Sequence, residues 1–174
     1  MTTRKDINMK DLNKIKLFAM DVDGTLTDGR IYMGNNGESM KAFNAKDGLG
    51  IKLLMSRGII PVIITGRASD IVMNRMKEIG ISEIYQNVKN KGEVMRELIK
   101  KYKLNKDQVS YIGDDMNDLS AIKEAGVTFA PADCAESLKP YIDILLTKNA
   151  GDASVREAAD MIMGDFDFDG FLDI

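Results

Sequence analysis

The stretch from Lys16 to Gly29 constrains the fold more than any other part of the chain. It reads KLFAMDVDGTLTDG: a short apolar run stops at Asp21, and a second carboxylate follows at Asp23. The run has the length of a strand that is buried within a parallel sheet. Open α/β sheets bind their ligands beyond the carboxyl ends of their strands, which is where Asp21 would lie. Residues i and i+2 of an extended segment point the same way, so the two carboxylates would need a cation or a proton nearby.

The residue types that the chain lacks narrow its chemistry. It has no histidine and a single cysteine, Cys134. This excludes Ser-His and Cys-His nucleophile systems, metal sites with histidine ligands and any disulfide within the chain. The chemistry must rest on carboxylates, hydroxyls, lysines and arginines, together with a hard cation such as Mg²⁺.

Short apolar runs alternate with amphipathic segments along the rest of the chain. This pattern predicts an α/β fold, a doubly wound, Rossmann-like parallel sheet with helices on both faces. We expect further strands at 59–64, 84–85, 109–112, 127–130 and 144–146. We expect helices at 69–78, 93–102, 119–125 and 154–163, a further one that Asp47 caps, and one that Asp133 starts. The length of 174 residues and the lack of a linker indicate one domain, residues 1–174.

Two segments stand apart from this alternation. Residues 29–44 hold two strand-like runs around an Asn-Gly turn, which predicts a β-hairpin flap after the first strand. A lone hairpin is marginally stable in water, so its apolar residues indicate a lid or a subunit contact. The tail, residues 164–174, alternates aspartate with phenylalanine. We expect this tail to dock, with the mouth of a neighbouring subunit's active site as its target.

Polar residues follow the predicted strands at the points where they end. Asp21, Thr65 and Asp114 each end a strand, and Lys91 opens the helix that follows another. Because the carboxyl ends of parallel strands meet at one edge, we expect these four side chains to share one crevice. The carboxylates would hold Mg²⁺, and the hydroxyl and ammonium groups would suit phosphate oxygens. Each motif alone is weak, but four at strand ends are a strong signal.

These motifs resemble a known family. DVDGTLTDG, the Thr65 strand end, Lys91 and GDDMNDL are similar, in this order, to the four motifs of the haloacid dehalogenase superfamily of phosphatases. GNNGESMKAFNAKDGLGIKLL, ITGRASDIV and GDASVREAADMI further resemble the branch without a cap domain that acts on 3-deoxy-D-manno-octulosonate 8-phosphate, in lipopolysaccharide biosynthesis. Relatives that act on nonulosonate 9-phosphates tend to carry glutamate after Thr-Gly, so Arg67 favours the octulosonate.

The resemblance implies a role for each motif residue. Asp21 would be the nucleophile that forms an aspartyl-phosphate, and Asp23 would act first as general acid and then as base. Asp21, Asp114 and the backbone carbonyl of Asp23 would bind Mg²⁺, and Thr65 and Lys91 would bind the transferring oxygens. Asp118 would orient Lys91 or a metal-bound water, and Asp115 would shape a turn.

Arg67 and Arg75 are candidate substrate-binding residues. They lie eight residues apart, about two helical turns, so both could face the crevice. A bidentate guanidinium would fit the carboxylate of a sugar acid, which makes Arg67 the expected partner. The alternative is two solvated surface arginines, the more common fate of this residue type.

Partners and location complete the expectations. The net charge of −3 argues against nucleic acid or an anionic membrane. The single cysteine and the absence of a signal peptide or a long apolar run favour the cytoplasm. The resemblance implies a homotetramer in which neighbouring subunits cover each site. Two alternatives are a receiver domain, whose acidic, threonine and lysine residues come in a different order, and a non-catalytic assembly module like those beside cytidylyltransferases. Turnover of a sugar phosphate would distinguish a phosphatase from both alternatives.

Overall fold

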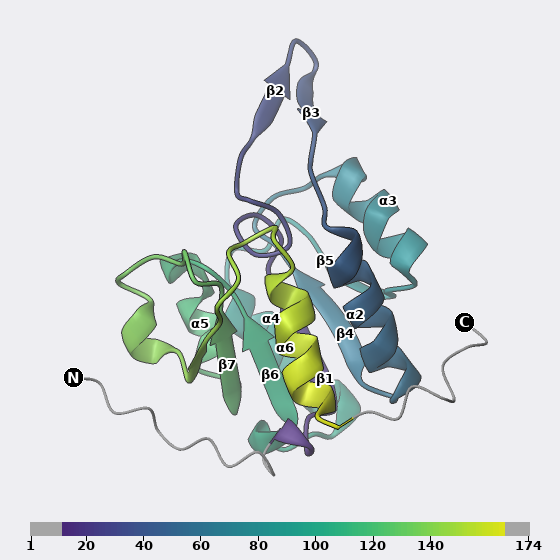
Figure 1. Cartoon of the computed structure of the whole chain (residues 1–174). Coiled ribbons are helices and arrows are strands. Elements are labelled where there is room, and N and C mark those ends of the chain that lie inside the picture. The colour runs from purple at the N-terminus through teal and green to yellow at the C-terminus, as the bar shows by residue number, and fades with distance from the viewer. Residues whose placement is uncertain (1–11, 166–174) are drawn as a thin grey trace.

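The centre of the molecule is a six-stranded parallel sheet in a computed structural model that describes residues 12–165 (Figure 1). The strand order is β5-β4-β1-β6-β7-β8. The strands are β1 (Leu17–Met20), β4 (Ile60–Ile64), β5 (Glu83–Tyr85), β6 (Val109–Ile112), β7 (Val127–Ala130) and β8 (Ile144–Leu145). The predicted doubly wound α/β fold is confirmed. The expected docking of the tail lies largely outside the described residues, because residues 166–174 are not among them.

Helices cover both faces of this sheet. They are α2 (Ala45–Ser56), α3 (Asp70–Ile79), α4 (Lys91–Tyr102), α5 (Leu119–Ile122) and α6 (Ser154–Met163). Alternation along β1 explains the two layers: Phe18 and Met20 pack into the core under α2, α3 and α6, whereas Leu17 and Ala19 pack against α4 and α5. Every residue of β1 is buried, which is why the strand reads as a continuous apolar run.

Two predicted helix starts are wrong. The cap of α2 is Asn44, whose side chain accepts a hydrogen bond from the N–H of Lys46, and Asp47 is buried in the first turn. The predicted helix at Asp133 does not form: β7 and β8 are joined by turns and a short 3₁₀ helix, η3 (Lys139–Tyr141). The Asp133 carboxylate accepts from the N–H of Ala150 instead of capping a helix, and Pro140 cannot donate a helical hydrogen bond.

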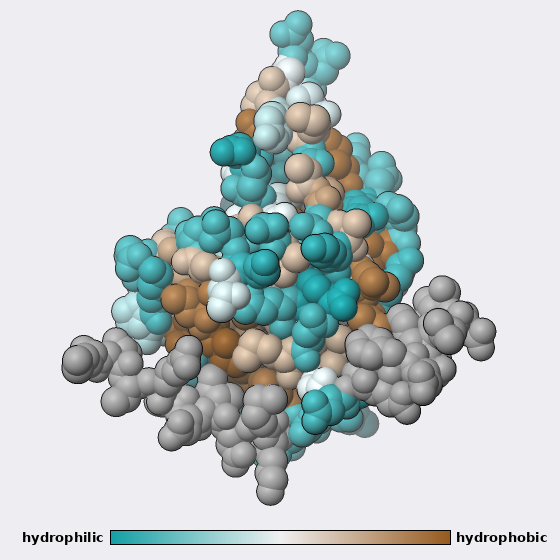
Figure 2. Space-filling view, viewed as in Figure 1, coloured by the Kyte–Doolittle hydropathy of each residue, from teal (hydrophilic) through white to brown (hydrophobic). Residues whose placement is uncertain are grey.

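The predicted hairpin is present and projects from the body of the molecule (Figure 1). It consists of the antiparallel strands β2 (Tyr32–Gly34) and β3 (Gly37–Met40). Phe43, beyond its base, packs against the core. Ile31, Met33 and Met40 stay 40%, 64% and 53% exposed, and Figure 2 shows apolar surface along the projecting hairpin. Its function as a flap stays a prediction.

The order of the strands places a crevice at the end of β1. After β1, the chain adds β4 and then β5 on one side of β1 within the sheet, and afterwards β6, β7 and β8 on the other side of β1. The point where the direction reverses lies between β1 and β6, and open α/β sheets bind ligands at such a point. Two further 3₁₀ helices, η1 (Lys106–Gln108) and η2 (Met116–Asp118), flank β6. None of the helices within residues 12–165 is both long and apolar enough to span a membrane.

Candidate active site

Three carboxylates meet where β1 and β6 end. Asp21 directly follows β1, whereas Asp114 and Asp118 follow β6. One carboxylate oxygen of each lies within 4.8 Å of the others. Asp21 is 3% exposed and Asp118 is fully buried. The structure thus brings together Asp21 and Asp114, two of the residues that the strand ends predicted.

The ammonium of Lys91 lies among these carboxylates. Its Nζ is 2.8 Å from Asp21 Oδ1 and 2.6 Å from Asp118 Oδ1, and its side chain is 2% exposed. Lys91 is the first residue of α4, and Asn90 caps that helix, so the position of the helix sets the position of the ammonium. A buried lysine is tolerated only where opposite charges offset its lost hydration, and here two carboxylates do so.

Both oxygens of Asp118 are already hydrogen-bonded. Oδ1 accepts from Lys91 and, at 2.6 Å, from the hydroxyl of Tyr111, and Oδ2 accepts from the backbone N–H of Asp114 at 3.0 Å. Asp118 is therefore built to hold Lys91 and the turn after β6, while the oxygens of Asp21 and Asp114 are better placed to receive a cation. Asp115 accepts from the N–H of Met116 and so shapes the same turn.

The charges of this site are not balanced by the protein alone. Burial raises the pKa of Asp21 to about 7, and Asp118 adds to the rise while Lys91 opposes it. Burial likewise raises the pKa of Asp114 to about 8, with Asp21 and Asp118 adding to it. Burial alone would lower the pKa of Lys91, but Asp118 and Asp21 outweigh it and raise that pKa. When all three carboxylates are ionised, the single ammonium leaves an excess of negative charge, and an all-oxygen set of this kind fits Mg²⁺.

Two glycines allow the carboxylates to come this close. A Cβ on Gly24 would lie 2.2 Å from Asp114 Oδ2, and one on Gly113 would lie 2.3 Å from Asp118 Oδ2. Gly24 also has a φ of 83°, which other L residues rarely adopt. The glycine of the DVDG motif is thus needed both for the turn and for the space beside Asp114.

Thr65 lies at the same edge of the sheet. It follows β4, which pairs with β1 in a register that sets Ile63 opposite Met20. Thr65 is 2% exposed, and its hydroxyl accepts from the N–H of Arg67 at 3.4 Å. The hydroxyl therefore lies one residue beyond the level of Asp21, on the neighbouring strand.

Asp23 contacts a lysine that the sequence pattern did not single out. The Nζ of Lys41, between β3 and α2, pairs with Asp23 Oδ1 and lies 2.8 Å from Glu38 Oε1. Burial alone would raise the pKa of Glu38, but hydrogen bonds from Lys41 and Ser69 outweigh it and lower that pKa. Arg67 approaches the same pair, with its Nε 3.8 Å from Asp23 Oδ2. A lysine eighteen residues from its partner follows no helical or strand period, so only the fold reveals it.

Known proteins resemble this chain over most of its length. Residues 75–159 match the family model for haloacid dehalogenase-like hydrolases. The 3-deoxy-D-manno-octulosonate 8-phosphate phosphatase KdsC of Escherichia coli (strain B / BL21-DE3) is 39% identical over 155 residues, which cover 89% of this chain and 82% of that protein. The chain belongs to this phosphatase family.

Solved structures of the family agree with the fold. The 3-deoxy-D-manno-octulosonate 8-phosphate phosphatase of Moraxella catarrhalis, in complex with a magnesium ion, a phosphate ion and a KDO molecule, matches with a TM-score of 0.85 and 42% identity over 89% of each chain. The cobalt-bound phosphatase of Haemophilus influenzae matches with a TM-score of 0.85 and 38% identity, over 88% of this chain and 90% of that one. The acidic cluster thus lies in a fold that holds a divalent metal in relatives.

The two arginines take different positions in this member of the octulosonate phosphatase family. Arg67, 48% exposed, faces Asp23 and Glu38. Arg75 pairs with Glu78 at 2.9 Å on its own helix, and its guanidinium lies beside Gly48 of α2. The structure therefore places Arg67 beside a predicted catalytic residue and Arg75 between α2 and α3. Substrate binding by either residue stays a prediction.

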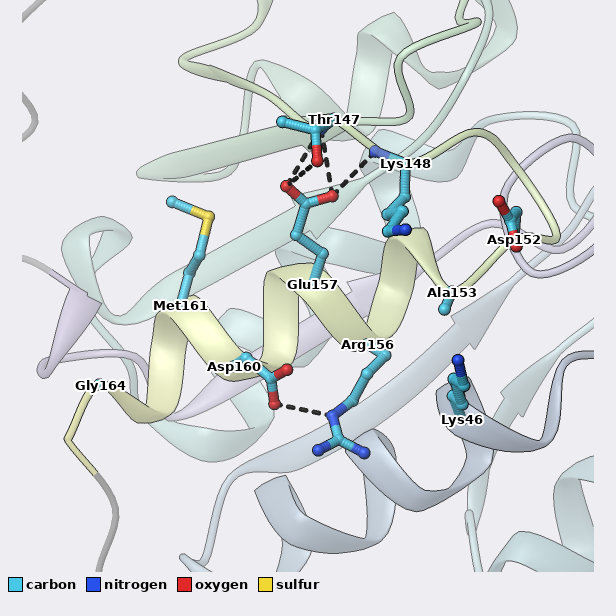
Figure 3. A pocket seen from close by; sticks show the side chains of 10 residues that line it. All are labelled: Lys46, Thr147, Lys148, Asp152, Ala153, Arg156, Glu157, Asp160, Met161 and Gly164. Atoms are coloured by element: carbon cyan, nitrogen blue, oxygen red, sulfur yellow. Dashed lines mark hydrogen bonds and ion pairs between the residues drawn. The ribbon is translucent and has the colours of Figure 1, made fainter.

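A separate hollow of about 560 Å³ lies along α6 (Figure 3). Two of its charged residues form an ion pair, Arg156 with Asp160 at 2.7 Å. Glu157 accepts hydrogen bonds from the hydroxyl of Thr147 and from the backbone N–H of Lys148. None of the residues of the acidic cluster lines it. The hollow is therefore a poorer candidate for phosphatase chemistry than the crevice at the end of β1.

Proposed function

We propose that this chain is an Mg²⁺-dependent phosphomonoesterase that hydrolyses the sugar-acid phosphate 3-deoxy-D-manno-octulosonate 8-phosphate through an aspartyl-phosphate. The observation that carries the proposal is the buried Asp21 at the end of β1, beside Asp114 and 2.8 Å from the Lys91 ammonium. The names of the relatives support the choice of substrate.

In the first half of the reaction, an oxygen of Asp21 bonds to phosphorus, and the bond between phosphorus and the sugar oxygen breaks. Asp23 gives a proton to that leaving oxygen, because a sugar alkoxide is too basic to leave without one. Lys91 and Thr65 hold the transferring oxygens and offset the negative charge on them.

In the second half, water attacks the phosphorus of the aspartyl-phosphate, and Asp23 takes a proton from that water. The bond between phosphorus and the Asp21 oxygen breaks, inorganic phosphate leaves, and both carboxyl groups return to their starting states. Asp118, held by Tyr111, keeps Lys91 in place through both halves.

The carboxylates of Asp21 and Asp114 and the backbone carbonyl of Asp23 would hold Mg²⁺. When bound, the ion supplies positive charge that reduces repulsion between the anionic nucleophile and the anionic phosphate. The excess of carboxylates over ammonium groups in this site supports that assignment.

We propose that Arg67 recognises the sugar-acid carboxylate. Arg75, which lies further along the chain in α3, is the second proposed substrate-binding residue. Arg67 lies at the start of the α3 segment, is about half exposed and approaches Asp23, so it can reach a substrate at the mouth of the site. A nonulosonate 9-phosphate is the second candidate substrate, since it carries the same carboxylate and a phosphate at the opposite end.

A panel of phosphate esters tests the proposed substrate. We expect the octulosonate 8-phosphate to have the highest kcat/KM among it, nonulosonate 9-phosphates, neutral sugar phosphates and p-nitrophenyl phosphate. Arg67→Ala should raise KM for the octulosonate at least about tenfold and change p-nitrophenyl phosphate little. Arg96→Ala is the control, because Arg96 forms an ion pair with Glu124 at the surface. Equal kcat/KM values for neutral and acidic sugars would refute the substrate, and no turnover of any ester would favour the non-catalytic assembly module.

A homotetramer and a cytoplasmic location belong to the same proposal. The exposed Ile31, Met33 and Met40 on the hairpin support self-association. The single buried Cys134 is in keeping with a reducing compartment. No cap domain is inserted within residues 12–165, so neighbouring subunits would cover the site in this proposal.

A further inference from the structure

Four charged side chains form a cluster at the base of the hairpin: Asp23, Glu38, Lys41 and Arg67. Asp23 comes from the loop after β1, Glu38 from β3, Lys41 from the segment between β3 and α2, and Arg67 from the loop after β4. Three parts of the chain that are distant in sequence therefore meet at the residue proposed as the general acid and base.

Lys41 is the most enclosed member of this hairpin-base cluster. Its side chain is 1% exposed, against 18% for Asp23, 13% for Glu38 and 48% for Arg67. Its ammonium pairs with Asp23 and lies 2.8 Å from Glu38. Arg67 stays 3.8 Å from Asp23 and 3.7 Å from Glu38. Lys41 is thus the close partner of the Asp23 carboxylate, and Arg67 is a looser one.

A buried ion pair of this kind contributes little to stability. Loss of hydration on burial offsets most of the attraction, so such pairs are better explained by the geometry that they fix. The ammonium of Lys41 lies between its two carboxylates, on a side chain that is almost wholly buried. The pair in turn fixes one oxygen of Asp23.

Glu38 holds Lys41 from the other side. Its second oxygen accepts a hydrogen bond from the hydroxyl of Ser69, the residue that caps α3. The chain of contacts runs from α3 through Ser69, Glu38 and Lys41 to Asp23. The hairpin strand that carries Glu38 is thereby attached to the body of the protein at the site itself.

We propose that Lys41 is a positioning residue for Asp23: it holds the Asp23 carboxylate where a proton can pass to the leaving oxygen, and Glu38 keeps Lys41 in place. This inference rests on the proposed function and on the role of Asp23 within it. It also implies that the position of the hairpin sets the geometry of proton transfer.

The proposal predicts a dependence on the leaving group. A p-nitrophenolate leaves without a proton, whereas the alkoxide of p-nitrobenzyl phosphate needs one. The two esters have nearly the same size and neither carries a carboxylate, so their comparison isolates proton donation from substrate recognition. The constant kcat/KM reports the first transfer step, in which Asp23 acts as acid.

The experiment compares Lys41→Met with Lys46→Met, an exposed lysine outside the cluster. For Lys41→Met we expect kcat/KM on p-nitrobenzyl phosphate to fall about tenfold to a hundredfold, and on p-nitrophenyl phosphate less than about threefold. Lys46→Met should change neither. Lys41→Arg should restore part of the loss, because it returns a cation to the same place. Glu38→Gln should give the same selectivity with a smaller loss.

Three results would overturn the inference. An unchanged kcat/KM on p-nitrobenzyl phosphate would show that Asp23 needs no help from Lys41. Equal losses on both esters, in a variant with the melting temperature of the wild type, would assign Lys41 to the phosphate instead. If Lys41→Met fails to fold, Glu38→Gln decides, and equal effects of that variant on both esters would count against the proposal. Failure of the wild type to hydrolyse 3-deoxy-D-manno-octulosonate 8-phosphate as well as both esters would refute the proposed function itself.

Discussion

At Gly24, both the fold and the chemistry depend on the absence of a Cβ atom. Alanine there would combine the strain of a φ of 83° with a Cβ placed 2.2 Å from Asp114 Oδ2. We expect Gly24→Ala to lose at least about a hundredfold in kcat/KM, because Asp114 must move. Gly58→Ala is the matched control, since its φ is 73° and its Cβ would meet nothing within 4 Å.

The control should lose about 1–2 kcal/mol in the free energy of unfolding and keep its activity. Urea unfolding and phosphate release measure the two effects separately. If both alanine variants kept full activity, the close approach of Gly24 to Asp114 would have no catalytic importance.

The site residues that could be predicted are those that end a strand. Asp21 and Thr65 stand directly after apolar runs and Asp114 stands one residue beyond another, and parallel strands bring such positions together. Lys41 could not be found in this way. Asp23 precedes the hairpin and Lys41 follows it, so only the folded hairpin brings the two side chains together. A lysine in an irregular segment is usually solvated.

At the scale of elements, Asp47 joins α2 to α6. The helix α6 begins after Ala153, which provides no side-chain cap, and the Asp47 carboxylate accepts from the N–H of Arg156 at 2.8 Å. The other oxygen of Asp47 is buried and has no hydrogen-bond partner among the described residues. Burial raises the pKa of Asp47 to about 6, and the N–H of Arg156 offsets only part of this rise.

This raised pKa predicts how stability depends on pH. The folded state binds the Asp47 proton more tightly than the unfolded state does. The stability that this protonated carboxyl contributes is therefore fully present below about pH 4 and is lost as the pH rises through about 6. Asp47→Asn cannot ionise. Its free energy of unfolding should therefore match that of the wild type below about pH 4 and exceed it by up to about 3 kcal/mol above about pH 7.

Urea unfolding at several pH values measures this difference, with the exposed Asp70→Asn as control. A difference between Asp47→Asn and the wild type that does not change with pH would show that Asp47 ionises normally in the fold.

The hairpin carries the prediction on assembly. Met33 and Met40 are more than half exposed, so Met33→Ser combined with Met40→Ser should leave the stability of the protomer nearly unchanged. If the hairpins join subunits, the variant should sediment near the protomer mass of 19.3 kDa while the wild type sediments near four times that value. Leu145→Ser, on the edge strand β8 and 48% exposed, should not change the mass. A wild type that sediments as a monomer would contradict the tetramer.

Elements differed in how well the sequence predicted them. The strands at 109–112 and 127–130 were predicted to the residue, because strands buried on both faces are mostly apolar. The helix at Asp133 was wrong, because a residue type that often caps helices can equally bind a distant backbone N–H, here that of Ala150. The sequence alone does not show whether such a side chain binds the backbone of the next helix or a distant N–H group.

At the scale of the whole molecule, the alternation of strands and helices was enough to predict the doubly wound fold and the edge at which the site lies. The relation between subunits could not be predicted from this alternation, because the proposed cover of the site would come from other copies of the chain. The central claim concerns what the crevice at the end of β1 does, and it can be tested in the isolated protein.

The most direct test measures phosphate release from 3-deoxy-D-manno-octulosonate 8-phosphate by the wild type and by Asp21→Asn. We expect the wild type to turn over with Mg²⁺, to stop in EDTA and to recover when Mg²⁺ returns. Asp21→Asn should lose about a thousandfold or more in kcat while its melting temperature shows an intact fold, because the amide keeps the shape but is no nucleophile. Turnover by Asp21→Asn within about tenfold of the wild type, with no deamidation by mass spectrometry, would contradict the account.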